Sequence, residues 1–163
     1  MKKFAMIKTL ALAGVVALSV TLDAQARGGG NRAIAGPSVT LSVEESDTLL
    51  WMREEEKLAQ DVYLTLHDEW GLMVLERIAA SEKRHFDALG DKIARYDLID
   101  PTLPVEGLFS VAELQVMYDD LVASGLVSRT DALVVGATIE DLDILDLMPA
   151  IEETDRADLK RTY

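Results

Sequence analysis

Apolar side chains recur at intervals of three and four residues in four stretches of this chain, and no stretch alternates polar and apolar residues as a strand would. These stretches cover about residues 42–70, 72–96, 110–125 and 128–148. Capping-box sequences open the first and third stretches at Ser42 and Ser110, and Gly71 separates the first two. The sequence therefore predicts an all-α fold, a helical bundle that begins with an antiparallel hairpin of two long helices.

Helix-breaking residues predict where the other connections lie. Two prolines and a glycine prevent a continuous helix over residues 97–109, so we expect a linker there. The fourth helix is predicted to end near Met148, before Pro149. Thr154 and Asp155 have the character of the start of one more helix.

Two of the apolar stripes are interrupted by ionisable side chains. The stripe of the second helix contains one carboxylate and one imidazole, and it comprises Leu75, Ile78, Glu82, His85, Leu89, Ile93 and Tyr96. The stripe of the first helix contains a single carboxylate, and it comprises Leu49, Met52, Glu56, Ala59, Tyr63, Leu66 and Trp70. A buried ionised carboxylate costs several kcal/mol unless a partner compensates its charge. The pattern therefore indicates a cation between these helices.

Three consecutive glutamates of the first helix compete for the inward position. Glu54 shares its face with Lys57 and Asp61, so we expect that face to be solvated. Glu55 is a second choice, because its neighbours on the helix are largely apolar. Glu56 has only apolar or aromatic neighbours and is the best inward candidate.

The fourth helix offers a matching carboxylate. Glu140 stands alone in an apolar stripe that comprises Leu133, Ala137, Ile144 and Leu147. Asp143 lies one turn further along, where we expect it to be solvated.

Together these positions predict a metal site. Carboxylates combined with imidazole suit iron, manganese or zinc, whereas a shell of oxygen atoms alone would suit calcium or magnesium. The predicted ligands are Glu56, Glu82, His85 and Glu140. Two alternatives need no metal: Glu56 pairs with Arg84, or Glu140 lies at an edge of the bundle and reaches water.

Two more polar side chains lie near these stripes. Tyr63 follows Glu56 by two turns, and it either packs in the core or donates a hydrogen bond to a ligand carboxylate. His67 is expected at the surface, where it would interact favourably with the C-terminal dipole of the first helix.

The first 26 residues have the pattern of a signal peptide. Three lysines precede or flank an apolar run over residues 10–20, and Ala24-Gln25-Ala26 supplies small residues for cleavage. The run is shorter than the ~20 residues of a membrane-spanning helix, although an uncleaved membrane anchor is the alternative. Residues 27–41 predict a flexible glycine-rich arm, which leaves 42–163 as the folded domain. We therefore expect an exported protein, periplasmic or extracellular, whose mature form is not embedded in a membrane.

Charge and cysteine content exclude several classes. The net charge of −13 argues against nucleic acid and anionic lipid as partners and favours cations. The chain has no cysteine, so disulfides, thiolate metal sites and cysteine nucleophiles are excluded. With two histidines and no Gly-x-Ser-x-Gly elbow, a hydrolase is disfavoured.

Three segments of the chain resemble a known family. They are Met52-Arg53-Glu54-Glu55-Glu56-Lys57-Leu58-Ala59-Gln60-Asp61-Val62-Tyr63, Ile78-Ala79-Ala80-Ser81-Glu82-Lys83-Arg84-His85 and Gly136-Ala137-Thr138-Ile139-Glu140-Asp141-Leu142-Asp143-Ile144. They resemble an uncharacterised exported ferritin-like family, a group with a domain of unknown function, related to rubrerythrin-like di-iron carboxylate proteins. The resemblance covers roughly Leu49 to Tyr163.

The resemblance implies a role for each predicted ligand. The ferritin-like superfamily holds two metals with a Glu on each of two helices and a Glu-x-x-His on each of the other two. Glu56 and Glu140 match the two single glutamates, and Glu82 with His85 matches one Glu-x-x-His. No histidine follows His85, and the sequence stops where the helix with the second motif should begin. The expected fold is thus a ferritin-like antiparallel bundle whose last helix is truncated.

Two functions follow as hypotheses. The first is an exported ferritin-like metal-binding protein, a di-iron oxidase or peroxidase or a metal-sequestering protein, whose site is incomplete in this chain. Its cofactor would be iron, with two ions if the missing helix is supplied, and manganese or zinc as alternatives. The second is a metal-free helical interaction module of the periplasm or cell exterior. In either case the open groove of the bundle would permit a homo-oligomer.

Overall fold

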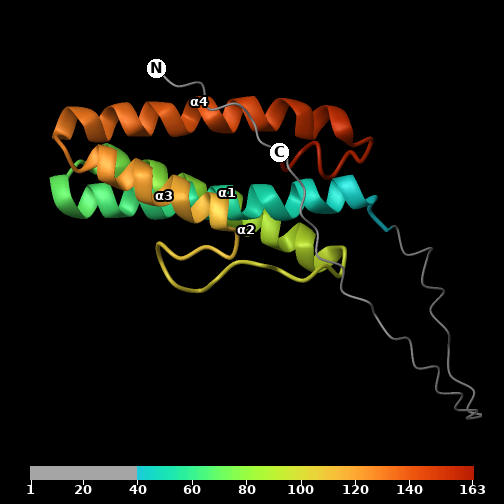
Figure 1. Ribbon diagram of the computed structural model, residues 1–163. Helices are drawn as coiled ribbons and strands as arrows, with labels where there is room; N and C mark the ends of the chain where they lie inside the picture. The colour runs from blue at the N-terminus through green and yellow to red at the C-terminus, as the bar shows by residue number, and fades with distance from the viewer. Residues whose placement is uncertain (1–39) are drawn as a thin grey trace, which may run out of the picture. The chain divides into compact units, whose positions relative to one another are not determined.

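The computed structural model describes residues 40–163, and within them the fold is all-α. The helices are α1 (Val43–Trp70), α2 (Met73–Arg95), α3 (Ala112–Gly125) and α4 (Arg129–Glu153) (Figure 1). No strand occurs in this part of the chain, which confirms the predicted helical bundle. The predicted signal peptide and all but the last two residues of the predicted arm lie outside the described residues. Between residues 40 and 163, no helix combines the length and the apolar character that crossing a membrane requires.

The first hairpin forms as the sequence predicts. Ser42 caps α1, because its hydroxyl accepts from the Glu45 amide at 3.0 Å while the Glu45 carboxylate accepts from the Ser42 amide at 2.9 Å. Gly71 ends α1 with a φ of 62°, a left-handed conformation that glycine adopts without steric cost. Since α2 begins at Met73, only a very short turn joins the two long helices.

The predicted cap of α3 is wrong. Val111 precedes that helix without a side-chain cap, and the Ser110 hydroxyl instead donates to Glu54 Oε1 at 2.5 Å. A tertiary contact has therefore taken the group that the capping box would have used.

The predicted end of α4 is also wrong. The helix continues through Pro149 to Glu153, although proline lacks the amide that a helix interior would use. Burial compensates this loss, because Ala150 packs into an apolar cluster with Leu49 and Leu89. Beyond α4, residues 157–162 form successive turns instead of the predicted further helix, and Leu159 joins the same cluster.

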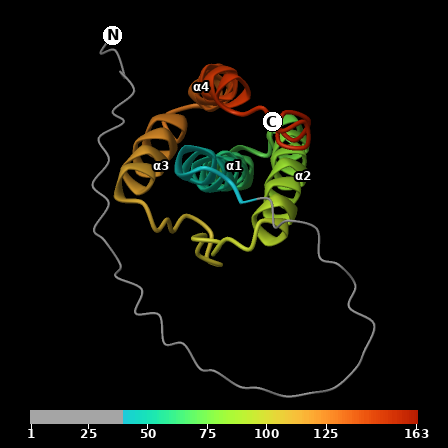
Figure 2. The same ribbon diagram turned by 90° about the vertical axis from the view of Figure 1, so that its right-hand side faces the viewer.

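Helix α1 is the centre of the fold. The end-on view shows α2, α3 and α4 around it, and α1 contacts each of them (Figure 2). Two apolar clusters form along its length. One surrounds its N-terminal half at Leu49 and Met52, and the other surrounds Leu58 to Leu66. Glu56 therefore lies between two apolar clusters.

The face of α1 that carries Glu54 is buried, so the prediction that it is solvated is wrong. Glu54, Lys57 and Asp61 are all buried beneath residues 97–111, which we call the strap. The Lys57 ammonium contacts the Asp61 carboxylate and donates to the carbonyls of Val105 at 3.0 Å and Leu108 at 3.3 Å. A strap of irregular backbone needs partners for its polar groups, and the charged residues of α1 supply them.

Other contacts fasten the strap further. Asp61 Oδ2 accepts from the Gly107 amide at 2.9 Å, and the Arg53 guanidinium pairs with Asp100 at 3.0 Å. Phe109 places its ring 4.5 Å from the Lys57 ammonium. The charges on this face of α1 thus have partners nearby, although Glu54 Oε2 is buried without a hydrogen-bond partner among the described residues.

We expect Asp61→Ala to lower the free energy of unfolding by about 3–5 kcal/mol, because it leaves the buried Lys57 charge without its anion. The matched control is Asp87→Ala, which breaks the exposed Lys83–Asp87 pair of the same spacing and should cost at most about 1 kcal/mol. Urea unfolding followed by circular dichroism measures both. Equal losses in the two variants would contradict the buried strap contact.

Candidate metal centre

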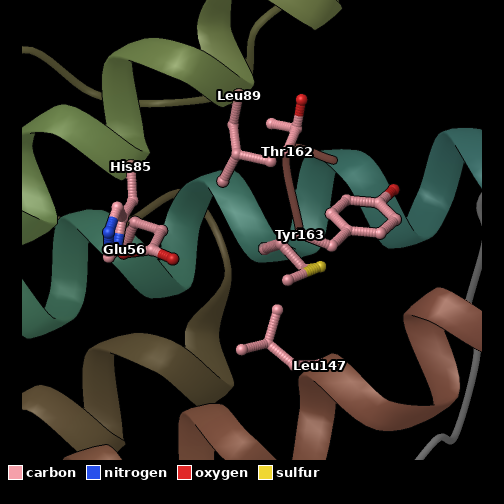
Figure 3. Close-up of a pocket in the computed structure, with 7 residues that line it drawn as sticks. Glu56, His85, Leu89, Leu147, Thr162 and Tyr163 are labelled. Carbon is pink, nitrogen blue, oxygen red and sulfur yellow. Dashed lines mark ion pairs between the residues drawn. The ribbon is translucent and has the colours of Figure 1, made fainter. Parts of the chain in front are cut away.

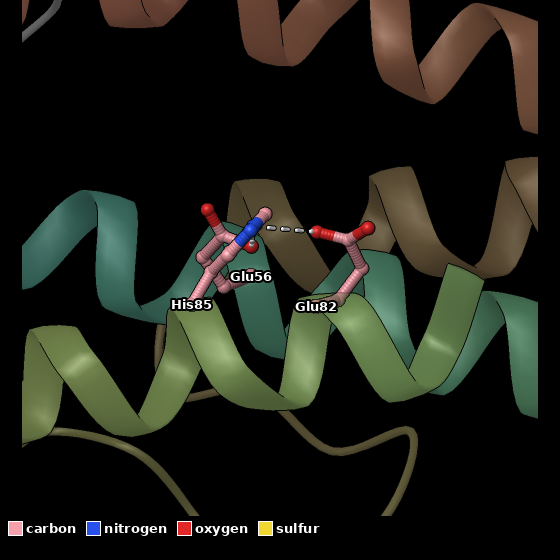
Figure 4. A group of neighbouring side chains, drawn as sticks. All are labelled: Glu56, Glu82 and His85. Atoms are coloured by element: carbon pink, nitrogen blue, oxygen red, sulfur yellow. Dashed lines mark ion pairs between the residues drawn. The ribbon is translucent and has the colours of Figure 1, made fainter. Parts of the chain in front are cut away.

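Glu56, Glu82 and His85 come together between α1 and α2 (Figure 4). His85 Nδ1 lies 3.2 Å from Glu82 Oε2 and 3.5 Å from Glu56 Oε2. One potential ligand atom from each residue lies within 4.8 Å of the others, a spacing that allows a shared cation. We call these three residues the triad. It is the one such group found among residues 40–163.

The local structure follows from the hairpin and from helical spacing. Glu82 and His85 are three residues apart on α2, so both project from one side of that helix. The short turn at Gly71 makes α2 run antiparallel along α1, which brings that side opposite Glu56. The proposed Glu56–Arg84 pair does not form, since Arg84 donates to Ala80 O at 3.0 Å and to Ser81 Oγ at 3.1 Å.

Burial differs sharply within the triad. The side chains of Glu56 and Glu82 are 14% and 6% exposed, whereas that of His85 is 55% exposed. The two carboxylates are therefore largely shielded from solvent, and the imidazole is the member of the triad that solvent reaches.

The charge of Glu56 lacks full compensation. Burial raises the pKa of Glu56 to about 9, and the neighbouring Glu82 carboxylate adds to the rise. Glu56 Oε2 is buried without a hydrogen-bond donor among the described residues, and the His85 ring at 3.5 Å is too far for a strong hydrogen bond. The surroundings of Glu56 thus disfavour the ionised form of its carboxyl group.

More carboxylates surround the triad than the sequence analysis expected. Asp143 is half-buried, not solvated as predicted, and its pKa rises to about 7 through burial and through repulsion by Glu82 and Glu140. The pKa of Glu55 rises to about 9, first through burial and then through the carboxylate of Asp146. The three-residue spacing of the acidic residues on α4 was the signal that could have revealed this side of the cluster.

Glu140 lies outside the triad, on the exposed side of α4. Its carboxylate accepts from the Tyr63 hydroxyl at 2.8 Å, and that hydroxyl also lies 3.1 Å from Gly136 O. Tyr63 is fully buried, which confirms its predicted packing in the core. Its hydrogen bond goes to Glu140, whose role as a ligand stays a prediction. Gly136 permits the close approach, because a Cβ at that position would lie 3.3 Å from the Tyr63 ring.

The remaining histidine is far less suited to a metal. His67 Nδ1 lies 3.1 Å from the carbonyl of Leu72, beside the turn that joins α1 and α2. The side chain is partly buried at the end of α1, near the position the sequence predicted.

A small cavity of about 80 Å³ adjoins the triad (Figure 3). Glu56 and His85 form one part of its wall, and apolar side chains form most of the rest. The other lining residues are Met52, Leu89, Leu147, Thr162 and Tyr163. The triad is therefore open to a molecule of a few heavy atoms.

The donor set fits a single cation. Two carboxylates and one imidazole are the ligands that borderline metals such as iron, manganese and zinc accept. A second cation fits less well, because Glu140 and Asp143 offer carboxylates alone and Glu140 lies outside the close group. The described residues thus offer three candidate ligands for one cation and only carboxylates for a second.

Residues 45–163 match the family described as "Uncharacterized protein domain (DUF2202)", and the chain belongs to this family. It is similar to the uncharacterized protein MJ0754 of Methanocaldococcus jannaschii, with 47% identity over 128 residues that cover 78% of this chain and 69% of the relative. It is likewise similar to the crystal structure of hypothetical protein MJ0754 from the same organism, with 46% identity and a TM-score of 0.75. That match covers 79% of this chain and 74% of the other. The description of this family names no activity, so the residues of the site carry the functional proposal.

The raised pKa of Glu56 makes the stability of the metal-free protein depend on pH. Its pKa is about 9 in the folded chain against 4.5 ordinarily, so the stability associated with its protonated form is complete below about pH 4.5 and is lost as pH rises through 9. We expect the free energy of unfolding to fall across this range, and Glu56→Gln to flatten the fall. Urea unfolding at a series of pH values measures it. Glu69→Gln, an exposed change on the same helix, should leave the profile unaltered.

The Tyr63–Glu140 contact predicts a measurable coupling. Tyr63→Phe should cost about 1–2 kcal/mol, because it removes a hydrogen bond to a charged group from a buried hydroxyl. In the presence of Glu140→Ala the same change should cost less, and a double-mutant cycle measures the difference. Tyr118→Phe, which removes a hydroxyl 2.9 Å from Thr65 Oγ1, should show no coupling to Glu140→Ala. Strictly additive effects for Tyr63 would show that its hydroxyl does not act on Glu140.

Proposed function

We propose that this chain is a ferritin-like metal-binding protein and that its triad holds one divalent iron ion, with manganese or zinc as alternative occupants. The observation that carries the proposal is the buried Glu56 oxygen without a donor, which faces a second carboxylate and an imidazole. A cation at this point would remove the cost of placing two carboxylates together in a dry interior.

The number of ligands favours an exchangeable site over a structural one. Three protein ligands leave coordination positions open, as metal sites that perform chemistry do, whereas structural zinc sites are closed by four. The exposed ring of His85 supplies the path by which an ion or a small molecule would enter. We therefore favour reaction or reversible storage of the metal over a purely structural role.

The ferritin-like part of the proposal concerns a second ion. Glu140 would be its first ligand, as the resemblance implies, and Tyr63 would hold that carboxylate in place. The described residues do not complete this second position. Two ions would require a further Glu-x-x-His, a motif that does not occur within residues 86–163.

A bound iron ion would supply one-electron exchange with oxygen or peroxide. The chain's own residues would do the rest. Glu56 and Glu82 would neutralise the ion, and the apolar wall of the cavity would restrict water. The cavity of about 80 Å³ would favour a small co-substrate. Oxidase, peroxidase and metal-sequestering activities are all compatible with this preference.

The signal-peptide pattern of the first 26 residues supports export, so we propose that the protein binds its metal in the periplasm or outside the cell. The strongly acidic composition is consistent with this setting, since it concentrates cations near the surface.

A metal-free interaction module is the second candidate. It is favoured by large apolar side chains that α4 exposes, namely Leu133, Val134, Ile144, Leu145 and Met148. Exposed apolar groups of this kind serve as contacts between proteins, including copies of one chain. Light scattering on the metal-free protein tests this candidate, since a strict monomer would weigh against a homo-oligomer.

The triad predicts which histidine matters for metal. We expect the full chain, incubated with ferrous iron without oxygen and then desalted, to retain close to one ion. His85→Ala should weaken retention by more than about tenfold, because it removes a direct ligand. His67→Ala is the matched control and should retain the metal, since that ring lies at the α1–α2 turn. Mass spectrometry of the metal content gives the result, and equal retention in both variants would remove the proposed site.

A further inference from the structure

We propose that Met52 is an oxidation site of this protein, and that hydrogen peroxide converts its thioether to the sulfoxide when the triad is loaded with iron. The inference rests on the proposed function of the triad. The sulfur gives an electron pair to one peroxide oxygen, the S–O bond forms as the O–O bond breaks, and the second oxygen leaves as water with both protons. The sulfide is oxidised by two electrons and the peroxide is reduced by two.

Position is the first support. Met52 precedes Glu56 by four residues on α1, so the two side chains are neighbours on one face of the helix. Both line the cavity of about 80 Å³ that His85 also lines. A peroxide molecule that enters this cavity to reach the triad is therefore held beside the thioether.

Access is the second support. Met52 is only 5% exposed, so peroxide from bulk solvent has almost no direct approach to it. His85, at the opening, is 55% exposed and belongs to the same wall. Apart from the cavity, the surroundings of Met52 are apolar, with Leu49, Leu89 and Ile93 in its cluster. A peroxide molecule in this cavity thus lies close to both the sulfur and the triad.

The chain contains its own comparison. Met73 and Met148 are 55% and 60% exposed and lie outside the cavity. Oxidation controlled by exposure alone would modify these two first and Met52 last. A cation in the triad would polarise the peroxide next to Met52 and reverse that order. The order of modification therefore reports where the peroxide reacts.

Oxidation of Met52 would alter the site that caused it. A sulfoxide is polar, and the apolar cluster around Met52 offers no donor to compensate it. The contact of α1 with α2 next to the triad would loosen as a result. The Met52 sulfoxide would thus mark protein molecules that have reacted with peroxide, and it would weaken the site at which they react.

The experiment treats the full chain with hydrogen peroxide with and without ferrous iron loaded beforehand, and follows each methionine by peptide mass spectrometry. With iron, we expect Met52 to be modified at least about tenfold faster than Met73 and Met148, because reactant and sulfur share one cavity. Without iron, the order should reverse. The same samples are assayed for bound metal.

Two variants complete the test. His85→Ala should abolish the preference for Met52 while Met73 and Met148 react as before. Met52→Leu should retain iron and the melting temperature, which would show that the thioether is not a metal ligand. Iron bound at the triad with Met52 the slowest to react would overturn the inference and leave the proposed function intact. An absence of bound iron would overturn both.

Discussion

The central position of α1 imposes the condition on which the rest of this structure depends. Because neighbours cover the helix on several sides, its charged side chains must find partners inside the protein. On the strap side most of them do. Arg53 meets Asp100, Lys57 meets Asp61, and Glu54 meets Ser110. On the α2 side, Glu56 meets only another carboxylate and the edge of an imidazole. Glu54 Oε2 on the strap side is likewise buried without a hydrogen-bond partner among the described residues. What singles out the triad is that the unsatisfied oxygen of Glu56 faces a second carboxylate and an imidazole, with potential ligand atoms within 4.8 Å of one another.

The same condition explains how the fold places the triad. Two apolar clusters flank the level of Glu56, and each contains residues of α1, α2 and α4. Carboxylates from all three helices then converge between the clusters, and burial raises the pKa of three of them. A core that was apolar throughout would be more stable, so the fold keeps these groups at an energetic cost. That cost is the physical reason to assign the region a ligand.

The local spacing of apolar and polar residues was enough to predict the helices, the first hairpin and the three residues of the triad. Glu56, Glu82 and His85 follow from helical spacing together with one tight turn, both of which are local properties. The errors share one origin. Glu54 and Ser110 depend on how the strap folds back over α1, and Pro149 depends on distant residues that bury Ala150. Asp143 was misjudged for a related reason, since its burial depends on where α4 lies relative to α2. Contacts between segments far apart in sequence leave no periodic signature.

The brevity of the turn at Gly71 has a consequence for how such a chain tolerates insertions. Each residue added to a helix rotates everything after it by about 100°. One extra residue early in α2 would therefore swing Glu82 and His85 around the helix axis and away from Glu56. An insertion in the strap has no such effect on the triad, because the strap follows α2 and leaves the direction of the Glu82 and His85 side chains unchanged. Length variation among relatives that keep the triad should accordingly concentrate in the strap and be absent from the hairpin.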